Sequence, residues 1–86
     1  MISIGITGYN GFVGKSILEK FEQRYQFDCY KKYQPFEITQ DVVIHLAGKS
    51  HDLRNILDAS EYYTVNTELT KKIFDAFLLS DAKIFI

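Results

Sequence analysis

The sequence has 86 residues, room for one small domain, and 47% of them are hydrophobic, too many for a disordered chain. A net charge of −1, with acidic and basic residues interspersed, argues against a nucleic acid or an anionic membrane as the main partner. No apolar run is long enough to span a bilayer. The single cysteine, Cys29, cannot form an intramolecular disulfide, which fits a reducing, cytoplasmic location.

The chain opens with an alternation of strand and helix. Residues Ile2–Ile6 are apolar and β-branched and predict a buried parallel strand. Residues Gly11–Arg24 carry apolar side chains at helical spacing and charged side chains on the opposite side, which predicts an amphipathic helix. Residues Phe27–Lys31 follow as a second candidate strand.

The connection between the first predicted helix and the next clear strand is too short for a complete crossover. Lys32–Gln40 contains Pro35 and predicts a loop, with a brief strand at Phe36–Ile38 as a further candidate. Asp41–Ala47 is the clearest second buried strand. Only Tyr25–Gln40 separates it from the first helix, whereas a parallel crossover needs about a dozen residues or more of its own. We therefore expect the sheet to be abridged on this side.

The last third predicts a helix and a strand. Lys49–Ser60 is polar and fits neither pattern. From Glu61 to Ser80 the apolar positions step by three and four, which predicts a long helix. Lys83–Ile86 begins another strand. Such alternation is typical of a parallel sheet with helices on its faces and right-handed crossovers.

Three glycines stand between the first strand and the first helix, in the stretch Thr7–Gly14. The first permits a tight turn, the second lets the backbone approach a diphosphate, and the third lets the helix pack close to the sheet. The free N–H groups and the dipole of the helix N-terminus favour the negative charge of phosphates. The predicted phosphate-binding residues are Gly8, Asn10, Gly11, Phe12, Val13 and Gly14.

Two other interpretations of this turn are weaker. A purely structural turn seldom needs three glycines at this spacing. A P-loop for nucleoside triphosphates would account for Gly14-Lys15-Ser16, but that motif requires a glycine where Tyr9 stands. The strand–turn–helix context therefore favours a dinucleotide, bound in a Rossmann fold.

The end of the second strand bears on the choice of cofactor, NAD or NADP. An acidic residue usually contacts the adenosine ribose there, about 20 residues past the turn. Here Asp28 comes too early, and Lys31 and Lys32 take the expected place. A cation would suit the 2′-phosphate of NADP; the alternative is that both lysines are solvated surface residues.

Three stretches, Thr7–Gly14, Asp41–Gly48 and Tyr63–Thr70, resemble the NAD-dependent epimerase/dehydratase family, the extended short-chain dehydrogenase/reductases that act on nucleotide sugars. The resemblance extends over essentially the whole chain. It implies that the glycine turn binds the pyrophosphate and that Glu37-Ile38 contacts the adenine. It also implies cofactor contacts along the ribose and adenosine and beneath the nicotinamide, from Leu46, Ala47, Gly48 and Asn66.

The fold class that follows is α/β: a partial Rossmann fold, a parallel sheet with flanking helices, truncated after the strand starting near Lys83. Residues 1–86 would form the N-terminal portion of an NAD(P)-binding Rossmann domain. An exposed last strand would invite association, for example as a homodimer.

The family's catalytic pair is missing from the sequence. The family uses a Ser or Thr and a Tyr-x-x-x-Lys pair, and no tyrosine here has a lysine four residues later. We therefore expect a fragment: the cofactor-binding portion of a nucleotide-sugar epimerase, dehydratase or reductase. Gly48–Asp52 resembles the branch used in bacterial surface-polysaccharide biosynthesis. The alternatives are a non-catalytic nucleotide-binding module and a non-functional truncated product.

The remaining reactive side chains have structural explanations. We expect His45 to be a packed core histidine, because no acid or nucleophile is spaced to meet it. His51-Asp52 is interpreted as a surface pair, and Cys29 as a small core residue. Tyr62 and Tyr63 should pack on the sheet. No two residues show the spacing of a zinc site.

Overall fold

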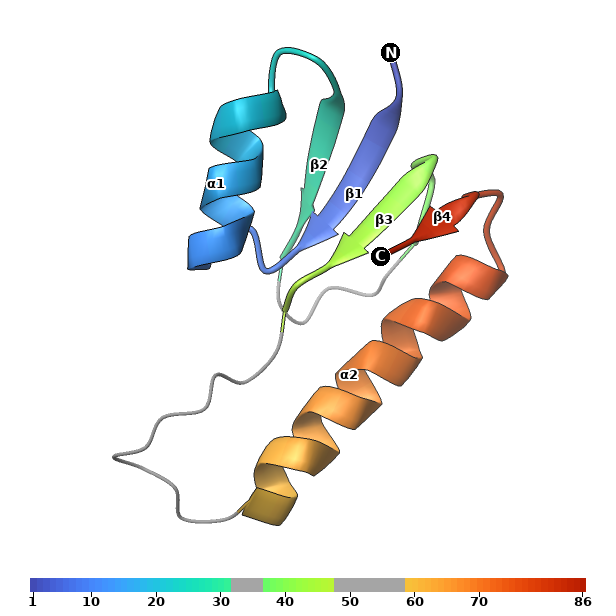
Figure 1. Ribbon diagram of the computed structural model, residues 1–86. Coiled ribbons are helices and arrows are strands. Elements are labelled where there is room, and N and C mark those ends of the chain that lie inside the picture. The colour runs from blue at the N-terminus through green and yellow to red at the C-terminus, as the bar shows by residue number, and fades with distance from the viewer. Residues whose placement is uncertain (32–36, 48–58) are drawn as a thin grey trace.

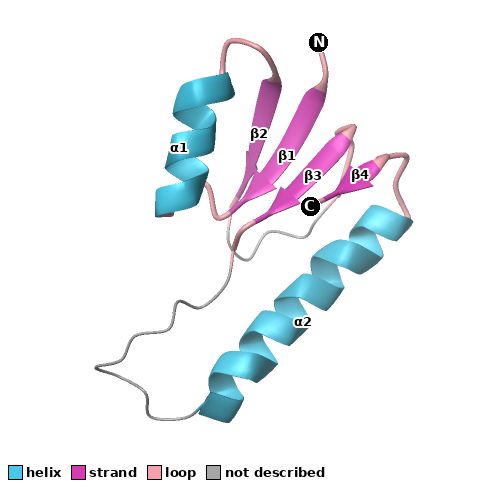
Figure 2. Cartoon of the chain, in the orientation of Figure 1, coloured by secondary structure: helices cyan, strands magenta, loops and turns pink. Residues whose placement is uncertain are grey.

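The computed structural model describes residues 1–31, 37–47 and 59–86, and the side chains of all of these except 59–65. Strands and helices alternate along the chain as the sequence predicts (Figures 1 and 2). The elements are β1 (Ser3–Thr7), α1 (Phe12–Phe21), β2 (Gln26–Tyr30), β3 (Val42–His45), α2 (Ala59–Leu78) and β4 (Ile84–Phe85).

The four strands form one parallel sheet in the order β2-β1-β3-β4. Thr7 at the end of β1 lies opposite Tyr30 in β2 and His45 in β3, so these three strands end level with one another (Figure 1). In the described residues no strand lies beyond β2, as expected from the short connection between β2 and β3. The predicted partial Rossmann sheet is confirmed.

The two helices belong to opposite faces of the sheet. The chain moves from β1 to β2 in one direction along the sheet and from β3 to β4 in the other. Because parallel crossovers are right-handed, the connecting helices then lie on opposite faces. On the α2 face, Ile38, Val43 and Ile73 form the buried core. Ile4 and Ile6 are also buried. They alternate along β1 with the residues that face α2, so they belong to the opposite face of the sheet.

The segment between β2 and β3 contributes to the core without forming a strand. Residues 37–39 have no regular structure, so the candidate strand at Phe36–Ile38 is wrong for the described part, and Phe36 lies outside it. Ile38 is 8% exposed and packs with Val43 and Ile73. A single apolar side chain here covers sheet surface that a complete crossover would otherwise cover.

Two other predictions change in detail. Helix α1 ends at Phe21 rather than Arg24, because the N–H groups of Arg24 and Tyr25 both bond to the Phe21 carbonyl in a closing turn. Cys29 is exposed rather than in the core, because β2 is an edge strand with few elements to cover its side chains. Edge pairing through β4 remains a prediction.

Candidate functional site

The glycine turn after β1 has a backbone that only glycine adopts easily. Gly8 has φ +71°, in the left-handed region. Its carbonyl accepts a 3.1 Å hydrogen bond from the Gly11 N–H, which closes the turn. A Cβ atom on Gly8 would lie 2.6 Å from the Ala47 nitrogen and 2.7 Å from the Leu46 carbonyl carbon. The turn is therefore pressed against the chain that follows β3.

Gly14 allows a second close approach. It is buried, and a Cβ atom there would overlap the Gly8 carbonyl oxygen and lie 2.8 Å from the Tyr9 Cα. The sequence argument expected Gly14 to let α1 approach the sheet, whereas the closest atoms belong to the turn itself. Gly14 thus holds the first turn of α1 directly over the Gly8 peptide.

Gly11 differs from the other two because the space beside it is open. It has φ −74°, and a Cβ atom would meet only the Gly8 oxygen, at 3.4 Å. It is the N-cap of α1, where no side chain caps the helix and no acidic residue occupies the first turn. The N–H groups of Phe12, Val13 and Gly14 therefore have no intrahelical acceptor and no competing carboxylate, and the first intrahelical bond is the one from the Lys15 N–H to the Gly11 carbonyl, 2.9 Å long.

The side chains around this helix start are exposed. Phe12 is 89% and Val13 is 53% exposed, and Asn10 is also at the surface. Open backbone amides and a favourable dipole suit a phosphate group, which can accept charge-assisted hydrogen bonds from such amides. That Gly8, Asn10, Gly11, Phe12, Val13 and Gly14 bind the cofactor remains a prediction with a fitting geometry.

The other predicted cofactor residues lie at the same edge of the sheet. Exposed Lys31 follows β2, and Leu46 and Ala47 follow β3. Because the chain leaves β1 toward β2 and leaves β3 toward β4, the edge between β1 and β3 is the switch point where open parallel sheets bind ligands. Half-buried Asn66 lies on α2.

Several predicted residues fall outside the described part. Gly48, Lys49, Ser50 and the His51-Asp52 pair belong to residues 48–58, and Tyr62 and Tyr63 belong to the part of α2 whose side chains are not described.

Sequence reasoning missed the part that Thr7 plays. Its side chain is 2% exposed, and its hydroxyl oxygen accepts hydrogen bonds from the Leu46 and Ala47 N–H groups, both 3.1 Å long. The same hydroxyl lies 2.7 Å from His45 Nδ1, and His45 Nε2 lies 3.0 Å from the Thr70 hydroxyl on α2. A polar residue that ends an apolar strand just before a glycine was the available signal.

His45 is half-buried, as expected of a packed histidine, but it is also hydrogen-bonded at both ring nitrogens. Burial lowers the pKa of His45 below its usual value of 6.5, because the charged ring loses hydration. The imidazole is therefore neutral at neutral pH, and it joins β1, β3 and α2.

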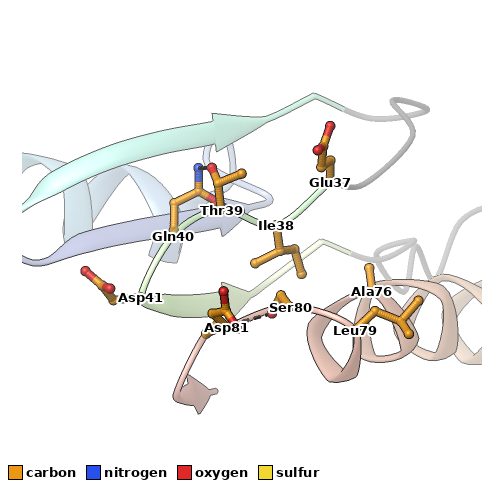
Figure 3. A pocket seen from close by; sticks show the side chains of 10 residues that line it. Glu37, Ile38, Thr39, Gln40, Asp41, Ala76, Leu79, Ser80 and Asp81 are labelled. Atoms are coloured by element: carbon orange, nitrogen blue, oxygen red, sulfur yellow. Dashed lines mark hydrogen bonds between the residues drawn. The ribbon is translucent and has the colours of Figure 1, made fainter.

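The described part of the chain also has a cavity away from the glycine turn. It has a volume of about 650 Å³ and lies between residues 37–41 and the end of α2 with the turn that follows it (Figure 3). Its lining includes the apolar residues Ile38, Ala76 and Leu79 and the acidic residues Glu37, Asp41 and Asp81. Since Ile38 is used by the core, Glu37-Ile38 as an adenine contact remains a prediction.

Within the described residues, no group of three histidine, cysteine or carboxylate side chains is gathered to hold a metal ion. The same residues contain no helix with the length and apolar character that crossing a membrane requires.

Comparison with known protein families decides the class. A model of the NAD-dependent epimerase/dehydratase family matches residues 4–86. The chain belongs to this family. Searches among curated proteins and among solved structures found no match.

In this epimerase/dehydratase chain, the family's nicotinamide dinucleotide has a suitable place at the turn after β1. The open space beside Gly11 leaves room for a diphosphate, and a side chain at this position would fill that space. The residues present therefore fit the cofactor that the family uses.

Proposed function

We propose that this chain is the cofactor-binding portion of an NAD(P)-dependent epimerase, dehydratase or reductase acting on nucleotide sugars. The observation that carries the proposal is the left-handed Gly8 turn, which places the uncapped α1 N-terminus at the switch point between β1 and β3. When bound, the nicotinamide would supply hydride chemistry at a sugar hydroxyl.

The protein's own part is to bind and orient. Amide N–H groups of the first α1 turn would hold the pyrophosphate, with Lys15 in the same turn adding positive charge. Leu46 and Ala47 would lie along the ribose and adenosine, as the resemblance implies. Asn66 lies one helical turn before Thr70 on the same side of α2, beyond the strand ends, which suits a place near the nicotinamide.

Finer parts of the proposal rest on sequence. A surface-polysaccharide pathway follows only from the resemblance of Gly48–Asp52. A cytoplasmic location is supported by Cys29, a free and exposed thiol of the kind that persists in reducing compartments. Lys31 at the end of β2 favours NADP without excluding NAD.

A second candidate is a non-catalytic nucleotide-binding module, favoured by the absence of any Tyr-x-x-x-Lys pair from the 86 residues. Titration calorimetry with NAD⁺, NADP⁺ and ATP tests both. Binding of a dinucleotide, with ATP clearly weaker, supports the turn as a dinucleotide site. Failure of both dinucleotides to bind the folded chain would refute the first candidate, and failure of ATP as well would refute the module.

The coding sequence that follows codon 86 distinguishes the two candidates. The 86 residues lack the family's Tyr-x-x-x-Lys pair, so neither candidate predicts hydride transfer by this chain alone. A Ser or Thr and a Tyr-x-x-x-Lys pair encoded directly downstream would favour the enzyme. A stop codon there, in an expressed reading frame, would favour the module.

A further inference from the structure

The hydrogen bonds around Thr7 fix the protonation state of His45. A threonine hydroxyl offers one proton and two lone pairs. Both lone pairs face N–H groups, those of Leu46 and Ala47, at 3.1 Å each, and the Leu46 N–H is shared with the Thr7 backbone carbonyl at 3.2 Å. The hydroxyl proton therefore points to His45 Nδ1, 2.7 Å away, and Nδ1 must accept it.

The second ring nitrogen follows from the first. A neutral imidazole with an accepting Nδ1 carries its proton on Nε2. Nε2 lies 3.0 Å from the Thr70 hydroxyl and donates to it. A protonated ring would present N–H at both nitrogens, and the Nδ1 proton would then oppose the hydroxyl proton of Thr7. The arrangement accommodates only the neutral Nε2–H form.

The hydrogen bonds of Thr7 position the Leu46–Ala47 segment of the candidate site. Thr7 ends β1 directly before Gly8, and the peptides it bonds are the ones that Gly8 presses against. If the Thr7 hydroxyl turned away to accept a proton from His45, the Ala47 N–H would lose its bond to Thr7, whereas the Leu46 N–H would keep its 3.2 Å bond to the Thr7 backbone carbonyl. The Leu46–Ala47 peptide, which lies against Gly8, would then be held less firmly.

We propose that Thr7 and His45 are positioning residues that hold Leu46–Ala47 against the glycine turn, and that dinucleotide binding requires the neutral Nε2–H form of His45. This inference rests on the proposed function, because it concerns the same site. It adds a proton-sensitive coupling between that site and α2.

The surroundings of His45 contain little that would titrate in its place. From β1 it faces Thr7, and from β2 the nearest ionisable group is Tyr30, which is opposite Thr7 and stays neutral because burial raises its pKa to about 12. From β4 it faces the Phe85 ring, at 6.2 Å between centroids. The Ile86 backbone oxygen accepts from the His45 backbone N–H, at 2.8 Å, rather than from the ring.

On α2, the helical positions one turn from Thr70 hold no ionisable side chain. They are Asn66, Thr67, Ile73 and Phe74. The nearest ionisable residues, Glu68, Lys71 and Lys72, lie about 100° or more around the helix from Thr70. Among the residues that the structure describes, a pH dependence of binding in the His45 range is therefore attributable to His45, and the other histidine, His51, is tested by its own variant.

Two measurements on the full 86-residue chain test the inference. Nitrogen-15 NMR of the histidine rings reports the tautomer and the pKa directly, and His45→Asn leaves only His51 and so assigns the spectrum. We expect the Nε2–H pattern and a pKa below 6.5. An Nδ1–H pattern would overturn the inference, whether or not dinucleotide binds.

Calorimetric titration with NAD⁺ over the same pH range gives the coupling. NAD⁺ is the probe because its diphosphate does not titrate near the His45 pKa. As the pH is lowered, Kd should stay constant until the His45 pKa is reached. Below that pKa, Kd should increase by at most tenfold per pH unit, which is the limit for one coupled proton. His45→Asn has no titratable group at this position, so its Kd should not change with pH in this range, whatever its value at pH 7.5. The control variant His51→Gln should retain the pH dependence.

Thr7 variants separate positioning from general stability. Thr7→Ser keeps the hydroxyl and should bind NAD⁺ within about twofold, whereas the isosteric Thr7→Val should bind at least tenfold more weakly, with folding checked by circular dichroism. Equal binding by both, or a Kd that stays flat through the His45 pKa, overturns the inference alone. An Nε2–H histidine in a folded chain that binds neither NAD⁺ nor NADP⁺ overturns the proposed function and the coupling with it.

Discussion

Replacing Gly8 by alanine should destabilise the chain severely. An alanine at φ +71° costs about 1–2 kcal/mol relative to glycine because its Cβ crowds the backbone. The same Cβ would lie 2.6 Å from the Ala47 nitrogen and 2.7 Å from the Leu46 carbonyl carbon, and such overlap with backbone costs about 1–3 kcal/mol more. The expected loss is therefore about 2–5 kcal/mol.

This loss is large for so small a chain. At about 0.05–0.15 kcal/mol per residue, 86 residues have a free energy of unfolding of about 4–13 kcal/mol. Urea unfolding followed by circular dichroism at 222 nm measures the change. With an m-value of about 1 kcal/mol/M, the midpoint for Gly8→Ala should fall by about 2 M or more, or the variant should be unfolded without urea.

Gly11→Ala is the matched control, because its Cβ would meet only the Gly8 oxygen at 3.4 Å. It should lose less than about 1 kcal/mol of stability, the range for a changed N-cap. Its methyl group would nevertheless stand beside the amides that face the phosphates, so Kd for dinucleotide should rise at least tenfold. Equal unfolding midpoints for Gly8→Ala and wild type would refute this account of the turn, and unchanged binding by Gly11→Ala would refute the phosphate site.

Three further outcomes follow from the structure. Ile73→Ala empties a fully buried position and should cost about 2–5 kcal/mol in a urea titration, whereas Leu79→Ala, at a 91% exposed position, should change stability little; similar losses would contradict the assigned core. Burial, and then the charge of Asp28, raise the pKa of Tyr30 to about 12, so the folded chain retains a proton that the unfolded chain loses near pH 10. Stability should thus be fully present below pH 10 and fall as pH rises toward 12, and Tyr30→Phe should reduce this fall. Lys31→Ala should weaken NADP⁺ binding several-fold and leave NAD⁺ binding unchanged in calorimetry; unchanged binding of both would indicate a solvated lysine, and equal weakening of both would contradict a contact to the 2′-phosphate.

The local elements were predictable because their causes are short-range. The glycine turn, α1 and β1 follow from residues within a few positions of each other, where apolar periodicity and glycine spacing act directly. The abridged sheet was also predictable, because chain length limits what a crossover can contain. The membership of the chain in its family rested on three such local stretches.

Exposure at the sheet edge was not predictable in the same way. Cys29 has the apolar character of a core residue, but β2 has no neighbour on its outer side in the described residues, and the thiol is exposed. Ile38, for which the family resemblance implies an adenine contact, also packs in the core on the α2 face, and the contact itself remains a prediction. Strand order decides these cases, and strand order is a property of the whole chain.

The sequence by itself determined the turn that could hold a diphosphate, because a bend that needs glycine is specified by the residues within it. Only the tertiary structure decided which residues hold that turn in position. Thr7 and His45 are 38 residues apart, and Thr70 is a further 25 beyond His45. Their hydrogen bonds exist because parallel pairing brings the ends of β1 and β3 level and α2 lies across them, and no local pattern encodes that meeting.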